Sequence, residues 1–599
     1  MRRQTARFPA LTCLVLALGA CEELNVDDEE HAQEEEGSGD SGGSSSGGSS
    51  SGASHGGDGN ADDVDADGDT KTETDDSSKP PRVALERGGV EGAWAEDGVR
   101  KFLGIPYAKE PGGELRWSAP QMPDKWSDDL KATKFARACP QLGESLPSGD
   151  DHLEDCLYLN VWAPGHNPKK ALPVLVWFHG GDHQQGSAAE RGDGEAHFDG
   201  TALARENVVV VTINYRLGPL GFLPLGEAPA PKSTREEGWN AALYGNQGLW
   251  DQAFALRWVQ DNIEVFGGDP DNVTIFGQGS GAVDVCMHVA SPVSGGKKLF
   301  QQAISQSGGC TTYQRTSSQV LDGASAWLEK LDCNNKANAD DVTKCLRGKS
   351  VRDLFAAIPD PAAASKWFSP SVDGTFMPEQ PRALFDDGNI ANVPYLLGTN
   401  ANEGSELLTG LTVDAEEDYH AALAKLFPSA TDVERCEVYP HDAYASAKKP
   451  YRLALSHVLG DGASTCAVLD TAQRARDADS DVYAYWFAGP EADDASAGHG
   501  AEIKYVFGAG EFSDGEAKLR DLMQRYWTSF AADGYPDGGE GTPDWPEFGA
   551  KRKVLSLGKD VTVLTDLRKA QCALWSDVYD AEFKARDLTD APKAEPKND

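Results

Sequence analysis

The fold of this chain is predicted from the stretch NVTIFGQGSGAVDV, residues 272–285. A short apolar run, VTIF, leads into a glycine-rich corner and then into a segment with helical character. Hydrolytic enzymes carry a nucleophilic serine on such a strand-to-helix corner, in the pattern G-x-S-x-G. Here the frame of that pattern, residues 277–281, is intact, but Gly279 occupies its centre and Ser280 follows one place later. The stretch predicts a strand, a sharp turn and a helix.

The sequence around this corner alternates between strand-like and helix-like segments. Nearly continuous apolar runs recur, among them PVLVWF, NVVVVTIN, VPYLLG and DVYAYWF, and strands that are apolar on both faces belong in a parallel sheet covered by helices. A final pair, KVLSLG and VTVLTDL, is typical of an edge hairpin. We therefore expect one α/β domain over residues 82–585, with a large, mostly parallel central sheet and helices on both faces, followed by a polar tail, 586–599. Ligands of such sheets bind at the carboxyl ends of the strands.

Residues 1–21 have the character of an export signal. Arginines at the start precede the apolar stretch FPALTCLVLALG, which is too short to span a membrane. The following LGAC resembles a bacterial lipobox, in which Cys21 becomes the lipid-modified first residue of the mature chain. The alternative is an ordinary cleaved signal peptide in which Cys21 has no role. The lipobox interpretation predicts an exported lipoprotein, periplasmic or on the outer surface, anchored to the membrane through Cys21.

Residues 22–81 form a glycine- and serine-rich acidic segment that lacks core-forming side chains and is expected to be a disordered tether. Its acidity, within a chain of formal net charge −41, argues against nucleic acid as a partner. The run DVDADGD, residues 63–69, imitates the start of a calcium loop, but Thr74 stands where that loop requires glutamate. We interpret the run as linker, and we expect neither a metal site nor a cofactor.

Several long motifs, in order, resemble the type-B carboxylesterases and cholinesterases of the α/β-hydrolase fold. The motifs are FLGIPYA (102–108), EDCLYLNVW (154–162), VWFHGG (176–181), INYRLGPLGFL (213–223), DNIEVFGGDPDNVTIFG (261–277) and YVFG (505–508). The resemblance covers nearly everything outside the leader and the tether. It implies an α/β-hydrolase fold and the carboxylic-ester hydrolase chemistry of a serine esterase.

The resemblance also implies a set of disulfides. An exported chain with eleven cysteines is expected to form such bridges. The family pattern pairs Cys139 with Cys156, Cys333 with Cys345, and Cys466 with Cys572. It assigns no partner to the remaining three cysteines of the domain, which are free or differently paired: Cys286, Cys310 and Cys436.

Ester hydrolysis on this fold needs a nucleophile, a histidine, an acid that orients the histidine, and amides that hold the oxyanion. The segment GTNANEG (398–404) resembles the family's acid loop and places Glu403 at the acid position. The segment GHGAEIKYVFG (498–508) resembles the histidine loop and places His499 at the base position. The resemblance therefore implies that the acid and base positions of the triad are retained.

The nucleophile position is substituted. Alignment without a gap, back to the strand and forward to HVASP (288–292), places Gly279 at the family's serine. Ser280 then takes the next position, whose backbone amide is an oxyanion donor. A nucleophile and its base must meet within ~3 Å, and an offset of one residue moves a side chain by more than that, so Ser280 is the less favoured alternative nucleophile.

The oxyanion loop, HGGDHQQGS (179–187), differs from the family's usual HGGG. Gly180 and Gly181 are retained, whereas Asp182 replaces the third glycine. The backbone amide of Ser280 would be the remaining donor to the oxyanion. Gln278 stands where the family usually has glutamate. A carboxylate ~4 Å from a developing oxyanion would cost about 4 kcal/mol at an effective dielectric of ~20.

Three functions are compatible with these residues. The first, which we favour, is a non-hydrolytic binding or adhesion module at the bacterial cell surface, whose ligand is a protein or a small ester-like molecule. The second is an active ester hydrolase that uses Ser280 or an atypical site with His499 and Glu403. The third is another reaction of the same side chains, such as one on water. The resemblance also implies that choline esters are not substrates. Cholinesterases bind the quaternary ammonium on a tryptophan between their first two disulfide cysteines, and the 16 residues between Cys139 and Cys156 include no Trp, Tyr or Phe.

Overall fold

The structure is a computed structural model that describes most of the predicted domain. The described residues are 79–95, 98–142, 153–165, 170–189, 191–192, 195–225, 245–296, 298–336, 338–409, 411–490 and 497–590. They all fall within one compact unit. The predicted signal with Cys21, nearly all of the tether and the last nine residues of the polar tail lie outside the described residues.

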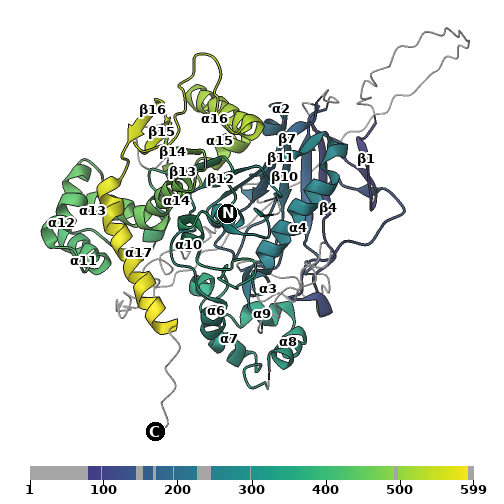
Figure 1. Ribbon diagram of the computed structural model, residues 1–599, viewed down its shortest axis with the longest axis horizontal. Helices are drawn as coiled ribbons and strands as arrows, with labels where there is room; N and C mark the ends of the chain where they lie inside the picture. The colour runs from purple at the N-terminus through teal and green to yellow at the C-terminus, as the bar shows by residue number, and fades with distance from the viewer. Residues whose placement is uncertain are drawn as a thin grey trace, which may run out of the picture. The chain divides into compact units, whose positions relative to one another are not determined.

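An 11-stranded sheet forms the centre of the described chain (Figure 1). Its seven middle strands, from β15 to β10, run parallel to one another. The four remaining strands, β16 at one edge and β6, β4 and β3 at the other, each pair antiparallel with their neighbours. The large, mostly parallel sheet and the edge hairpin, β15–β16, are therefore confirmed. In spatial order the strands are β16 (Thr562–Thr565), β15 (Lys553–Gly558), β14 (Val482–Gly489), β13 (Tyr395–Asn400), β12 (Gln302–Gln306), β11 (Gly268–Gln278), β7 (Leu172–Phe178), β10 (Val209–Ile213), β6 (Tyr158–Ala163), β4 (Arg100–Pro106) and β3 (Ala93–Trp94).

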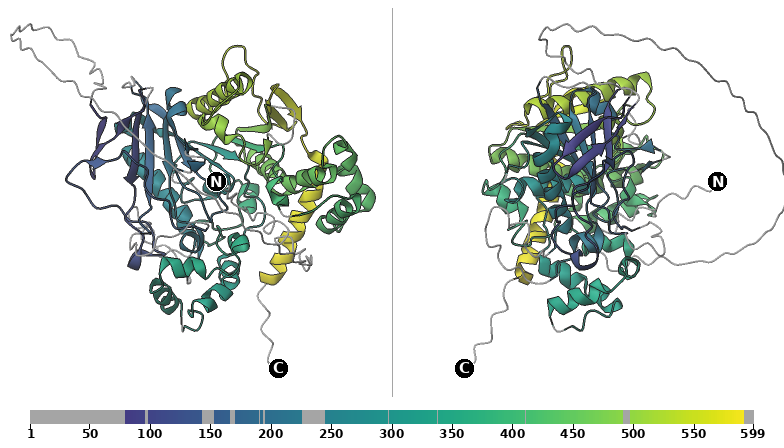
Figure 2. Two further views of the ribbon diagram at one scale, coloured as in Figure 1. Left: turned by 180° about the vertical axis from the view of Figure 1, so that it is seen from behind. Right: turned by 90° about the vertical axis from the view of Figure 1, so that its right-hand side faces the viewer.

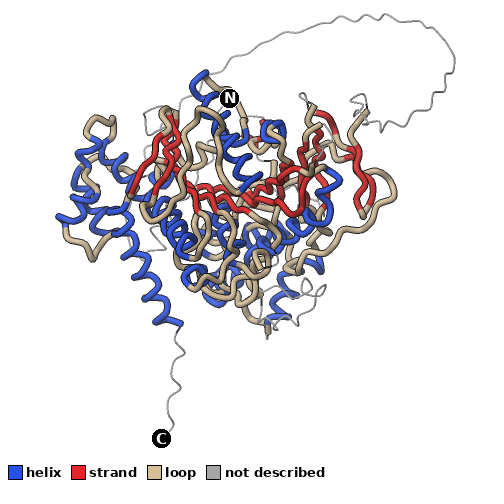
Figure 3. The backbone as a smooth tube through the Cα atoms, turned by 45° about the horizontal axis from the view of Figure 1, so that its top comes forward, coloured by secondary structure: helices blue, strands red, loops and turns tan. Residues whose placement is uncertain are grey.

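Strand β7 shows why the runs are apolar throughout. Val174, Val176 and Phe178 pack into one core, whereas Leu175 and Trp177, which alternate with them, pack into a second core on the other face. Side chains of α4 (Gln247–Asn262) and α5 (Ser280–Ala290) contribute to the first core. Those of α15 (Ile503–Phe507) and α16 (Asp514–Asp533) contribute to the second. Helices on both faces were predicted, and the tube view shows the strands running between helical layers (Figure 3).

A third core lies among helices from the C-terminal half of the chain: α11 (Glu416–Leu426), α12 (Asp432–Val438), α13 (Pro450–Gly460) and α17 (Lys569–Asp590). Figures 1 and 2 show this group beyond the edge of the sheet formed by β15 and β16.

Further strands and helices of the described chain are β1 (Arg82–Leu85), β2 (Gly88–Glu91), β5 (Leu130–Lys131), α2 (Thr201–Arg205), α3 (Gly218–Phe222), α6 (Ser317–Gly323), α7 (Ser325–Lys330), α8 (Ala339–Arg347), α9 (Val351–Ala356), α10 (Pro381–Asp386) and α14 (Cys466–Asp477).

The disulfides agree with the family pattern and add one bridge to it. The three expected pairs, Cys139–Cys156, Cys333–Cys345 and Cys466–Cys572, are confirmed. A fourth bridge, Cys286–Cys310, was not predicted. It forms because α5 follows β11 and packs over the neighbouring parallel strand β12, whose carboxyl end leads to Cys310. Cys436 joins no disulfide among the described cysteines.

Among the described helices, none is both long and apolar enough to cross a bilayer.

Candidate active site

The corner after β11 has the geometry of a nucleophile elbow with a glycine at its tip. Gly279 has φ 59° and ψ −123°, a conformation that strains any residue with a side chain. Its amide donates to the carbonyl of Gln306, 2.9 Å away, and α5 begins at the next residue. A Cβ atom added to Gly279 would lie 3.1 Å from Nε2 of His499. The corner is therefore shaped to aim a side chain at this histidine, but Gly279 has none to present.

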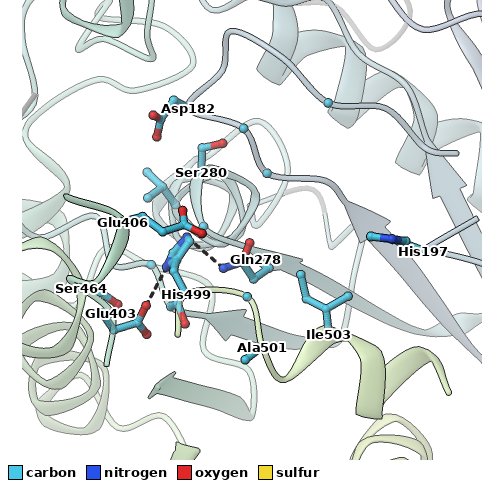
Figure 4. Close-up of a pocket in the computed structure, with 18 of the residues that line it drawn as sticks. Asp182, His197, Gln278, Ser280, Glu403, Glu406, Ser464, His499, Ala501 and Ile503 are labelled. Carbon is cyan, nitrogen blue, oxygen red and sulfur yellow. Dashed lines mark hydrogen bonds and ion pairs between the residues drawn. The ribbon is translucent and has the colours of Figure 1, made fainter. Parts of the chain in front are cut away.

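The predicted acid and base meet as a hydrogen-bonded pair (Figure 4). His499 Nδ1 lies 2.6 Å from Oε2 of Glu403. The other carboxylate oxygen of Glu403 accepts from the Asn400 amide at 2.6 Å and from the Thr399 hydroxyl at 2.9 Å. Thr399 and Asn400 are the last two residues of β13, and Glu403 lies in the loop after that strand. His499 lies in the segment after β14. Neighbouring parallel strands thus bring together residues separated by 96 positions.

Carboxylates determine the protonation of this histidine. Burial lowers the pKa of His499, but the charge and hydrogen bond of Glu403 outweigh burial, and the pKa rises to about 9. Burial tends to raise the pKa of Glu403, yet His499 lowers it overall. At neutral pH the pair is therefore an imidazolium and a carboxylate. On the open side of the ring, the Gln278 side-chain nitrogen lies 2.9 Å from His499 Nε2.

The raised pKa predicts how the imidazole titrates. By NMR, the His499 ring should titrate with a midpoint near pH 9, and Glu403→Gln should return that midpoint toward or below 6.5, because burial then acts with less opposition. His288, whose pKa burial lowers to about 4, is the internal reference and should not change. Since the folded pKa of His499 exceeds its unfolded value of 6.5, the stabilisation linked to protonation of the ring is complete below pH 6.5 while Glu403 is ionised, and it is lost as pH rises through 9. A wild-type midpoint near 6.5 would contradict this assignment.

Ser280 is not brought to the histidine. Its hydroxyl oxygen accepts from the backbone amide of His183 at 3.3 Å, in the loop after β7. Figure 4 shows its side chain directed away from His499. Because Ser280 begins α5, its direction is set by the helix and by packing, and only 9% of its surface is exposed. The geometry therefore disfavours Ser280 as a nucleophile.

The loop after β7 carries the expected oxyanion positions beside this corner. Gly180 packs closely against the backbone of Gln278, since an added Cβ would lie 2.6 Å from the Gln278 carbonyl oxygen. Gly181 and Asp182 have positive φ angles of 114° and 55°. Aspartate tolerates such a conformation better than most residues, so the turn survives the replacement of a glycine. The Asp182 side chain is solvent-exposed and lines the same cavity as His499.

Sequence reasoning missed a buried polar chain behind the oxyanion loop. The His183 ring lies 2.8 Å from a carboxylate oxygen of Asp284, whose other oxygen accepts from Gln252 at 2.7 Å. Gln252 in turn lies 2.9 Å from the ring of His288. Asp284 and His288 are buried four residues apart on one face of α5, within the otherwise small or apolar SGAVDVCMHVA. Two polar residues at this spacing in an apolar helix were the sequence feature that could have indicated a buried polar network. The hydrogen bonds of this network anchor the oxyanion loop to α5.

The elbow, the Glu403–His499 pair and the oxyanion loop line a cavity of about 1150 Å³ at the carboxyl ends of the parallel strands. Its lining combines glycine-rich backbone with carboxylates from Asp182, Glu406 and Glu511 and the ammonium of Lys504. The place of the cavity matches the expectation for open α/β sheets.

Comparison with known proteins identifies the family. Residues 79–575 match the carboxylesterase family. The chain is 34% identical to the para-nitrobenzyl esterase of Bacillus subtilis, over 81% of this chain and 96% of that protein. It is 32% identical to the cholinesterase of Mus musculus, over 80% and 83% of the two chains. A solved structure titled PNB esterase superposes with a TM-score of 0.67 at 33% identity, covering 83% of this chain and all of that one. The chain belongs to the carboxylesterase family and has the α/β-hydrolase fold.

Proposed function

We propose that this domain is a non-hydrolytic member of the carboxylesterase family that binds a small ester-like or carboxylate ligand in its cavity. The observation that carries the proposal is the tip of the elbow, where Gly279 has no side chain to present to His499. Loss of the nucleophile costs about 10⁶-fold in well-studied serine hydrolases. The acid, the base and the oxyanion turn remain to recognise a ligand.

The protonation of His499 supports binding over catalysis. An imidazolium has no free lone pair, so it cannot act as a general base, but its Nε2–H can donate to a carbonyl or carboxylate oxygen. The Gln278 side-chain nitrogen lies against Nε2 in this structure, and rotating the amide by 180° would place its oxygen there as the acceptor that the protonated ring requires. Because Asp182 and Glu406 also line the cavity, a neutral ester or a singly charged acid fits better than a polyanion.

Residual hydrolysis is the second candidate, because the Glu403–His499 hydrogen bond of 2.6 Å is retained. With Gly279 at the tip, the nucleophile would be Ser280 or a water molecule beside Nε2. Either course requires a deprotonated His499 and so predicts activity only toward alkaline pH.

The test combines turnover, labelling and binding on the purified protein. With p-nitrophenyl acetate and a fluorophosphonate probe at pH 7, we expect neither hydrolysis above buffer nor a labelled residue. Butyrate or its p-nitrophenyl ester should bind in calorimetry, and His499→Ala should weaken binding at least ~10-fold, the loss expected for a charge-assisted hydrogen bond. Labelling at Ser280, or turnover abolished by His499→Ala, would overturn the proposal. Binding of a protein alone would assign the domain to adhesion.

We also propose that the domain is displayed at the bacterial surface by a lipid on Cys21. The lipobox-like LGAC and the acidic tether that follows support this placement. Cys21→Ala should move the protein from the membrane fraction to the soluble fraction, without changing ligand binding. If Cys21→Ala leaves the division between membrane and soluble fractions unchanged, Cys21 carries no lipid anchor and residues 1–21 are an ordinary signal peptide.

A further inference from the structure

We propose that Glu416, His420 and His441 form a binding site for a divalent transition-metal ion, with Zn²⁺ as the best fit. One donor atom from each of the three residues lies within 4.8 Å of the other two. The site belongs to the helical group beyond the β15–β16 edge, where α11 and α12 are labelled in Figure 1. It is independent of the proposed function of the cavity.

The donors come from two segments that the fold places together. Glu416 and His420 lie four residues apart on α11, a spacing that puts both side chains on one face of a helix. His441 begins a short 3-10 helix, residues 441–444, that follows α12. Both histidines direct Nε2 at the same carboxylate oxygen of Glu416, at 3.3 Å from His420 and 3.2 Å from His441.

These separations match a metal site. Zinc bonds of ~2.0–2.1 Å in a tetrahedral arrangement separate two donor atoms by about 3.3 Å. Imidazole nitrogen with a carboxylate oxygen suits zinc and its neighbours in the transition series, whereas Mg²⁺ and Ca²⁺ prefer all-oxygen sites. Three protein donors leave a fourth position for water, and the exposed fraction of the Glu416 side chain, 51%, gives solvent access.

The outer nitrogens of both rings also have partners. His441 Nδ1 faces a carboxylate oxygen of Asp442 at 3.4 Å, and His420 Nδ1 faces the Cys436 sulfur at 3.6 Å. Metal-binding histidines usually engage their second nitrogen in this way, which orients the ring. Buried Tyr419 adds edge-to-face ring contacts to both histidines, at 5.7 and 5.9 Å between centroids.

A cation at this point would be the common partner of one carboxylate oxygen and two ring nitrogens, since the three donor atoms lie within 4.8 Å of one another. Asp442 is the positioning residue, while Glu416 and the two Nε2 atoms are the ligands.

The test is Zn²⁺ binding to the chelator-treated full protein, by calorimetry and by competition with a chromophoric chelator. We expect one Zn²⁺ per chain at this site and a rise in Tm on binding. Glu416→Gln and His441→Ala should each weaken binding at least ~10-fold, and Asp442→Asn by ~10- to 100-fold. Glu417→Gln, on the same helix, is the matched control and should bind as wild type.

Two outcomes would overturn the proposal. One is unchanged Zn²⁺ affinity in folded Glu416→Gln and His441→Ala, with folding checked by circular dichroism. The other is a thiolate-to-metal absorption band in the Co²⁺ form that is lost in Cys436→Ser, which would make Cys436 a ligand and not the partner of the His420 outer nitrogen. If His441→Ala does not fold, His420→Ala provides the same comparison from α11.

Discussion

Gly279→Ser should convert the binding site into an esterase. The backbone at 279 already has the elbow conformation, with φ 59° and ψ −123°, and the new Cβ would point at His499 Nε2 from 3.1 Å. That contact is tight, so the ring must retreat by a few tenths of an ångström, and Gln278 must release Nε2. Restoring the nucleophile should raise kcat/KM for p-nitrophenyl acetate by at least ~10³-fold, part of the ~10⁶ that its loss costs.

Gly279→Ala is the matched control, because it adds the same Cβ without a hydroxyl and should remain inactive. The fluorophosphonate probe should label residue 279 in Gly279→Ser only. Because the pKa of His499 is about 9, activity should increase from pH 7 to pH 9 as the ring becomes a general base. A folded Gly279→Ser variant without activity or labelling would show that the site is repurposed beyond the missing serine.

Addition of Asp182→Gly should raise the activity of Gly279→Ser further. A carboxylate ~4 Å from the oxyanion costs about 4 kcal/mol at an effective dielectric of ~20, equivalent to a ~10³-fold upper limit. The side chain is solvent-exposed, so the expected gain is ~10- to 100-fold. Asp182→Asn removes the charge and keeps the side chain, and should give most of the same gain. No gain from either variant would mean that the carboxylate lies away from the reacting oxygen.

Asp251→Ala should cause the largest loss of stability, about 3–5 kcal/mol in the free energy of unfolding. Asp251 on α4 accepts two bonds of 2.7 Å from the Arg216 guanidinium and one of 3.1 Å from its backbone amide. The side chains are 0% and 3% exposed. Removal of the carboxylate leaves a buried guanidinium without its counter-charge, and urea unfolding measures the cost.

Two further variants separate this pair from ordinary surface ion pairs. Asp261→Ala, which breaks the exposed i,i+4 bridge to Arg257, should cost less than ~1 kcal/mol. The double variant Arg216→Met/Asp251→Leu should be more stable than Asp251→Ala, because it removes both buried charges. Equal losses in Asp251→Ala and Asp261→Ala would refute the assigned role of burial.

The sequence by itself determined the central sheet and the two retained triad positions. Runs such as PVLVWF have apolar residues at every position, and only strands covered on both faces bury all of them. The acid and base were predictable because each lies in a long motif, and neighbouring parallel strands bring Glu403 and His499 to one edge. These features depend on local pattern and on motif order, which a sequence records directly.

Tertiary structure alone decided the features that depend on side-chain direction and on neighbours distant in the chain. Ser280 follows the elbow tip in sequence, yet the start of α5 turns its hydroxyl to the His183 amide. The Cys286–Cys310 bridge arises from the packing of α5 over β12, and the His183–Asp284 pair from the meeting of the β7 loop with that helix. Glu416 and His441 are 25 positions apart, and no local pattern indicates that their donor atoms converge. Local sequence predicts which elements form, whereas packing decides which side chains meet.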